Sequence, residues 1–251
     1  MPNHQRVLDL LERGNNAAVA ITGTGRQPLT YSDLKGQIEK TISQFNQLGV
    51  GRNDPVAIVL PNGPEMAAAF VAIASGATTA PLNPAYREEE FYFYLSDLDT
   101  RLLVVEEGSR TPALLAAERL GIPVARLKNS TDPRTIDFDL VGESVASGPS
   151  LGGVAVSEDI ALVLHTSGTT ARPKIVPLSH RNLCASARHI LQSLALVPED
   201  RCLNVMPLFH IHGLMAAVLS SLAAGASVFC TPGFNALKFF ASMKEAQPSW
   251  Y

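Results

Sequence analysis

Hydroxyl side chains are concentrated in the segment Leu164–Lys174, LHTSGTTARPK, which follows the apolar run Ile160–Leu164. A glycine in such a loop lets backbone N–H groups point the same way, and the hydroxyls add further donors. Lys174 adds a full positive charge. These are the groups that bind phosphate oxygens, so the segment predicts a phosphate-binding loop. The candidate ligands are Thr166, Ser167, Gly168, Thr169, Thr170 and Lys174.

Two other phosphate-binding classes do not fit this loop. The spacing GxxxxGK[ST] of a Walker A loop is absent, and so are the protein-kinase signatures, which makes a kinase the weakest hypothesis. For a generic loop of serine, threonine and glycine, a solvated surface turn would be the plain interpretation. The complete string after a buried strand is more specific than that.

The string TSGTTARPK resembles the phosphate-loop signature of the adenylate-forming superfamily, which includes acyl-CoA synthetases, luciferases and peptide-synthetase adenylation domains. Two further stretches stand in the family's order, PLNPAYREEEFYFYLSD at 81–97 and MPLFHIHGL at 206–214. The resemblance covers essentially the whole chain. HTSGTTARPKIVPLSHRNL and PLFHIHGLMAAVLSSLAAGASV are most similar to oxalate–CoA ligases.

The resemblance implies a reaction in two halves. A carboxylate attacks the α-phosphate of ATP and releases pyrophosphate, and the thiol of coenzyme A then attacks the acyl-adenylate. The loop would hold the β- and γ-phosphates, with Lys174 neutralising leaving-group charge or bracing the loop. Mg²⁺ would bridge the phosphates, with Thr169 as a weak candidate contact through the ATP-bound ion.

Histidines supply the second set of candidates. By its place after Pro207–Phe209, His210 resembles the family's acyl-site histidine, which would hydrogen-bond the substrate carboxylate or gate its pocket. His212 is a second substrate-binding candidate, since a dianion such as oxalate needs several donors. His165 is expected to be an aromatic-sized filler. His4, His180 and His189 are expected at surface or helix positions.

Two residues depart from the superfamily's usual pattern, TSGTTGxPKG. Ala171 stands at the usual glycine, and would be strained by about 1–2 kcal/mol if that position requires a positive φ. The oxalate-ligase subgroup resembles this sequence in lacking that glycine. Ile175 replaces the second glycine, which puts the exit of the loop in question.

Short apolar runs alternate with helical stretches along the chain, and such unalternating strands are typical of a parallel sheet covered on both faces. We therefore expect an α/β fold of layered, mostly parallel sheets with helices on both faces. Residues 1–150 would form a first subdomain and 151–251 would start a second with the phosphate loop. The expected linker is 128–157. The Pro-rich stretch 80–84 is expected to be a loop.

Composition excludes other classes. Charged residues make up 17% of the chain and the net charge is −3, so no footprint for nucleic acid or an anionic membrane is present. The apolar run Leu214–Cys230 is short, interrupted and without basic flanks, which predicts no membrane span. Three cysteines without CxxC spacing favour a reducing, cytoplasmic setting over disulfides or zinc.

Residues Ser249–Tyr251 resemble the start of another strand, and a chain that ended there would leave a sheet edge unpaired. We expect the N-terminal part of a longer protein, inactive or crippled as an isolated chain; the alternative is that 249–251 is merely a tail. A missing portion of the chain, or an oligomeric partner, would cover the apolar surface. Competing hypotheses are an adenylation domain that loads a carrier protein and a truncated, non-catalytic binding module.

Overall fold

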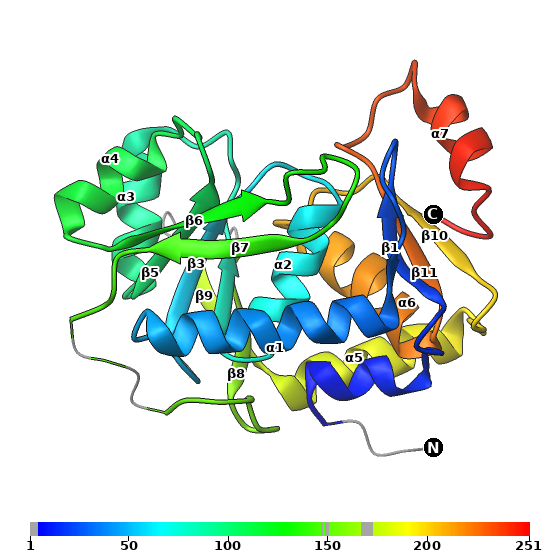
Figure 1. Cartoon of the computed structure of the whole chain (residues 1–251), viewed down its shortest axis with the longest axis horizontal. Coiled ribbons are helices and arrows are strands. Elements are labelled where there is room, and N and C mark those ends of the chain that lie inside the picture. Colours follow the sequence, from blue (N-terminus) through cyan, green and yellow to red (C-terminus); the bar gives the residue numbers. More distant parts are fainter. Residues whose placement is uncertain (1–4, 147, 149–150, 167–172) are drawn as a thin grey trace.

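The computed structural model describes residues 5–251 apart from 147, 149–150 and 167–172 and contains two β-sheets (Figure 1). The larger sheet has the spatial order β7-β6-β5-β3-β4-β8-β9 and the smaller has the order β10-β11-β1-β2. The strands of the larger sheet are β3 (Pro55–Val59), β4 (Thr78–Pro81), β5 (Leu102–Glu106), β6 (Val124–Asn129), β7 (Phe138–Gly142), β8 (Ile160–Thr166) and β9 (Lys174–Ser179). Those of the smaller are β1 (Val19–Gly23), β2 (Leu29–Thr30), β10 (Arg201–Asn204) and β11 (Ser227–Cys230).

Both sheets are mostly parallel, as predicted. In the larger sheet β6, β5, β3, β4 and β8 run parallel, and only the edge strands β7 and β9 are antiparallel. In the smaller sheet β10, β11 and β1 are parallel, and β2 is antiparallel. Parallel neighbours place their carboxyl ends at one edge of a sheet, which is where ligands bind in α/β folds.

Helices cover the sheets in layers (Figure 1). Alternate residues of β3 face opposite ways: Val56 and Ile58 join the core beneath α1 and α2, whereas Ala57 and Val59 join the core beneath α3 and α4. The outer face of the smaller sheet packs on α7 through Leu203. The helices are η1 (Val7–Arg13, a 3₁₀-helix), α1 (Tyr31–Gln47), α2 (Pro64–Ala74), α3 (Glu88–Asp97), α4 (Ala113–Leu120), α5 (His180–Ser193), η2 (His212–Leu219, a π-helix), α6 (Ser220–Ala224) and α7 (Phe239–Ala246).

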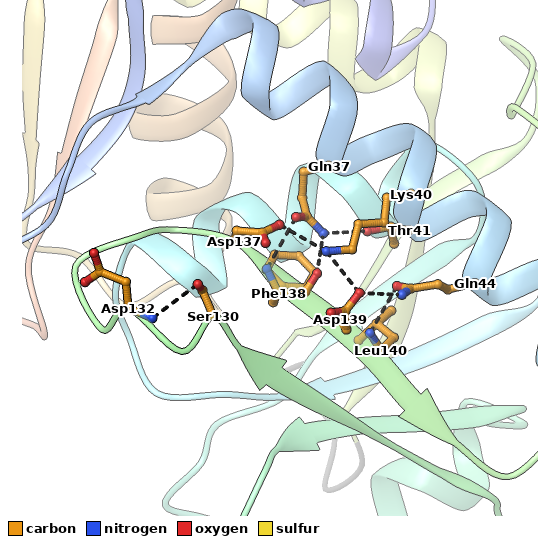
Figure 2. Close-up of polar contacts among 10 residues, drawn as sticks. All are labelled: Gln37, Lys40, Thr41, Gln44, Ser130, Asp132, Asp137, Phe138, Asp139 and Leu140. Carbon is orange, nitrogen blue, oxygen red and sulfur yellow. Dashed lines mark hydrogen bonds and ion pairs between the residues drawn. The ribbon is translucent and has the colours of Figure 1, made fainter.

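The outer edge of β7 is paired by side chains of α1 rather than by another strand (Figure 2). Gln37 donates to the carbonyl oxygen of Phe138 at 3.0 Å and accepts from its N–H at 3.4 Å. Gln44 accepts from the N–H of Leu140, two residues on, at 3.0 Å. An edge strand otherwise presents unpaired backbone groups. We call this contact the α1–β7 seam.

Two sequence expectations about irregular segments are wrong. The expected linker 128–157 contains β7, in which Phe138 and Leu140 are buried while the residues between and after them are not. Its alternation is typical of a half-buried strand and is easily taken for a polar loop. The expected loop at 80–84 begins as β4, because Pro81 lacks only an N–H and still takes a place in the parallel register beside Ile58.

Both sheets combine strands from before and after residue 150, because β8 and β9 extend the larger sheet and β1 joins β11. The boundary expected at 150 therefore does not coincide with the division into sheets, and as a domain boundary it stays a prediction. Cys184, Cys202 and Cys230 are buried and unpaired, and burial raises the pKa of the Cys184 and Cys202 thiols to about 12. Among the described residues no helix is long and apolar enough to cross a membrane.

Candidate active site

The predicted phosphate loop leaves the carboxyl end of β8 and returns as β9. Thr166 is the last residue of β8 and lies opposite Lys174, the first residue of β9, in the antiparallel register. Both side chains are exposed, so the hydroxyl and the ammonium group stand together at the mouth of the loop. The remaining candidates, Ser167, Gly168, Thr169 and Thr170, and also Ala171, lie outside the described residues.

His210 lies on the segment that joins β10 to η2, and His212 lies at the start of η2. His210 donates its backbone N–H to the carbonyl of Pro207 at 3.2 Å, and its own carbonyl accepts from Leu214 at 3.2 Å. His212 is the first residue of η2, and both imidazoles are exposed. Exposed imidazoles held on a defined backbone can offer N–H donors to a bound carboxylate.

Glycine is required where η2 begins. A Cβ atom on Gly213 would lie 2.7 Å from the carbonyl oxygen of Pro207, a distance that backbone atoms would have to relieve by moving. The motif glycine therefore lets the first turn of η2 lie directly against the segment that carries His210. π-Helices often occur at functional sites, and this one starts at a candidate residue.

The two candidate groups share one edge of the fold. Leu208 and Phe209 line a small cavity of about 50 Å³ together with residues that follow β3 and β4, namely Leu60, Leu82 and Pro84. Strand β8, which ends in Thr166, is the parallel neighbour of β4. The histidine segment, Thr166 and Lys174 therefore all lie at the carboxyl edge of the larger sheet, although no hydrogen bond joins His210 to Thr166 or Lys174 among the described residues.

Sequence reasoning missed two asparagines that hold the histidine segment. Asn62 accepts from the N–H of Leu208 at 2.8 Å, and Asn204 accepts from the N–H of Met206 at 3.1 Å. The triplet Pro61-Asn-Gly63 is typical of a turn after a strand. A turn asparagine gives no sign in the sequence that its side chain reaches a segment almost 150 residues away.

The other interior histidines differ from each other. The imidazole of His165 is 4.6 Å from the ring of Tyr94 and lies 3.0 Å from a carboxylate oxygen of Asp97, so it packs as an aromatic-sized filler with one polar contact. His180 was expected at a surface or helix position; it begins α5 but is fully buried, where its Nδ1 accepts from the N–H of Val7 at 3.0 Å. Burial lowers the pKa of His180 to about 4.

The AMP-binding enzyme family matches residues 11–251, which is nearly the whole chain. The chain belongs to this family of AMP-binding enzymes. Oxalate–CoA ligase of Arabidopsis thaliana is 40% identical over 238 residues, covering 92% of this chain and 46% of the relative. That of Saccharomyces cerevisiae is 33% identical over 271 residues, covering 97% and 50%.

This AMP-binding chain also shares its fold with solved structures. Apo MatB from Rhodopseudomonas palustris superposes with a TM-score of 0.78 at 23% identity, over 97% of this chain and 48% of MatB. The chain thus spans about half the length of the curated relatives it matches. The α/β expectation and the resemblance to oxalate–CoA ligases are both confirmed.

The chemistry of the described site fits a nucleotide phosphate. A threonine hydroxyl and a lysine ammonium at the carboxyl edge of a parallel sheet are typical phosphate ligands. No group of three His, Cys, Asp or Glu side chains within the described part of the chain is placed to hold a metal ion. The predicted magnesium contact through Thr169 lies outside the described residues.

Proposed function

We propose that this chain carries the phosphate loop and part of the acyl site of an enzyme that activates a carboxylic acid with ATP. The carboxylate oxygen bonds to the α-phosphorus as the bond to pyrophosphate breaks, and the thiol of coenzyme A then displaces AMP from the acyl carbon. The observation that carries this proposal is the family match over residues 11–251, with the phosphate-loop motif at the carboxyl end of β8.

The described residues have distinct roles in this scheme. Thr166 and Lys174 bind phosphate oxygens, and Lys174 offsets charge that develops on the leaving pyrophosphate. His210 and His212 donate to the carboxylate, which suits a small diacid such as oxalate better than a fatty chain. ATP supplies the α-phosphate and Mg²⁺ screens the phosphates when bound. We place the reaction in the cytoplasm because the three buried cysteines are unpaired.

The apolar surface around α7 supports the proposal that further polypeptide completes the enzyme. Leu237, Phe240 and Tyr251 are 95%, 79% and 70% exposed. Relatives of about twice the length match this chain over only half of their own sequences. We infer that the remaining portion of the chain, or an oligomeric partner, covers this surface and that residues 1–251 alone turn over poorly.

Carboxylate-dependent exchange of labelled pyrophosphate into ATP tests the first half-reaction. The assay uses the protein from its own cells, with its intact mass measured alongside, and offers oxalate against hexanoate. We expect exchange with oxalate, AMP release that requires coenzyme A, and a loss of about 100-fold in kcat/KM for His210→Ala. The matched control is His189→Ala, which removes an exposed helical histidine and should leave exchange unchanged. The assignment would be contradicted if no carboxylate supported exchange. It would also be contradicted if His210→Ala exchanged pyrophosphate as fast as the wild type.

A further inference from the structure

The backbone that carries His210 is held by side chains and turns rather than by a strand or helix. Residues 205–211 lie between the end of β10 and the start of η2 and belong to neither sheet. The Asn204 side chain binds both backbone groups of Met206: it accepts from the N–H at 3.1 Å and donates to the carbonyl at 3.2 Å. Because sheet pairing is absent here, each of these bonds fixes backbone that would otherwise be free to move.

One side chain ties this segment to both sheets. The Oδ1 atom of Asn62, in the loop after β3, accepts from the N–H of Leu208 at 2.8 Å. Its Nδ2 atom donates to the carbonyl of Thr231, which follows β11, also at 2.8 Å. Asn62 belongs to the larger sheet's connections and Thr231 to those of the smaller sheet. A carboxamide suits this position because its oxygen accepts from one partner while its NH₂ group donates to the other.

The position of Leu208 determines that of His210. Leu208 is 1% exposed and lines a small cavity together with Leu60 and Leu82. Two residues on, His210 closes a turn onto Pro207 and is exposed at the carboxyl edge. Because Leu208 is held by Asn62 and the His210 N–H is bonded to Pro207, the backbone between Leu208 and His210 has little freedom left.

We propose that Asn62 is a positioning residue for His210: its amide holds Leu208 against the end of β11 and so aims the imidazole at the bound carboxylate. This inference rests on the proposed function for the role of His210, but the contact itself does not. Asn62 touches neither ATP nor substrate in this scheme. Its loss should therefore weaken use of the carboxylate while leaving use of ATP unchanged.

Asn62→Leu has nearly the same shape as asparagine and removes both hydrogen bonds. Gln44→Met is the matched control, because Gln44 also clamps backbone through its amide but does so in the α1–β7 seam (Figure 2). In the purified chain we expect the Leu208 amide to exchange hydrogen at least tenfold faster in Asn62→Leu and the His210 imidazole NMR signal to shift. Gln44→Met should alter neither. If the leucine variant does not fold, Asn62→Ala, which leaves room for water, should show the same two changes.

Activity separates positioning from general destabilisation. In the exchange assay, Asn62→Leu should raise KM for the carboxylate about tenfold and leave KM for ATP unchanged. In a His210→Ala background the same change should add nothing, because no imidazole remains to be aimed. Unchanged Leu208 exchange and an unmoved His210 signal would overturn the proposal. So would additive effects of the two variants. If the wild type shows no exchange with any carboxylate, the proposed function fails, while the NMR result still decides the contact.

Discussion

Carboxamide side chains hold backbone in two regions of this chain, with different consequences. In the α1–β7 seam, Gln37 and Gln44 pair the outer edge of a strand whose inner edge is already bonded to β6. Around the histidine segment, Asn62 and Asn204 bond backbone that belongs to no strand. The same type of side chain therefore completes regular structure in one region and replaces it in the other.

This difference predicts whether the loss of a hydrogen bond lowers the stability of the fold or changes the candidate site. In the seam, the strand stays in register because its other edge is paired, so loss of an amide leaves buried groups unsatisfied and lowers stability. In the histidine segment, loss of an amide frees the backbone locally and moves a candidate functional group. Variants of the seam should change the free energy of unfolding, whereas variants of the histidine segment should mainly change the site.

Protonation of His180 is expected to have the largest effect, because this side chain clamps buried backbone but can titrate. Its pKa is about 4 when folded, against an ordinary 6.5, so the unfolded chain binds the proton first. This contribution to stability is complete above pH 6.5 and is lost as pH falls towards 4, by about 3 kcal/mol in total. Urea unfolding at several pH values measures it.

Two variants separate the contribution of His180 to the pH dependence of stability from that of the carboxylates, which titrate in the same pH range. In His180→Asn, Oδ1 can take the place of Nδ1 as acceptor for Val7 without titrating, so the steep loss between pH 6.5 and 4 should shrink. His189→Gln changes an exposed histidine and should keep the wild-type slope. If the free energy of unfolding depended on pH equally in His180→Asn and in the wild type, the pKa of His180 would not be lowered in the folded chain.

Gln37→Met should have the next largest effect and tests the seam directly. Methionine fills similar space but leaves both the N–H and the carbonyl of buried Phe138 without their partner. We expect a loss of about 2 kcal/mol in the free energy of unfolding, with the His210 NMR signal unchanged. A shifted His210 signal, or a loss below about 0.5 kcal/mol, would remove the distinction between the two regions.

The sequence predicted the parts of the fold that have strong local patterns. Local patterns are strong in the apolar runs of β5 and β8, in the alanine-rich α2 and at Ser179, whose side chain accepts from the N–H of Asn182 where α5 begins. Strand β7 was missed, because it alternates polar and apolar residues between turn-forming residues. Its strand character depends on α1 and β6, which neighbour it only after folding.

The candidate site shows the same limit. His210 and the hydroxyl loop could be named as candidates because they lie in short motifs that resemble a known family. Asn62 was not, because its function depends on β3 and β10 meeting across two sheets. The burial of His180 was missed for a similar reason: its partner, Val7, is 173 residues away and has no local signal.

Asn204→Leu tests the histidine segment, as Gln37→Met tests the α1–β7 seam. The side chain is 1% exposed and brackets Met206 only, so its loss frees one turn of the histidine segment. We expect a loss of about 1 kcal/mol in the free energy of unfolding, which is smaller than for Gln37→Met. The His210 signal should nevertheless shift, and KM for the carboxylate should rise. An effect on stability as large as that of Gln37→Met, with an unmoved His210 signal, would contradict this.

Lys40→Met should have the smallest effect, although its ion pairs lie in the seam (Figure 2). Lys40 Nζ lies 3.1 Å from Asp137 and 3.0 Å from Asp139, and all three side chains are a third to a half exposed. Burial lowers the pKa of Lys40, but the bonds from the two aspartates outweigh it and raise the pKa overall. Exposed pairs of this kind contribute little, so we expect a loss of about 0.5 kcal/mol at low salt.

Salt separates this ionic contribution from the amide clamps beside it. The loss in Lys40→Met should vanish in about 1 M NaCl, where the Debye length falls to about 3 Å. Lys35→Met is the control. Lys35 lies on α1, as Lys40 does, but it bonds the uncharged amide of Asn16. The loss in Gln37→Met should persist at high salt, since it comes from buried neutral groups. A Lys40 effect that salt does not reduce would mean that the side chain contributes through packing of its methylene groups and not through its charge.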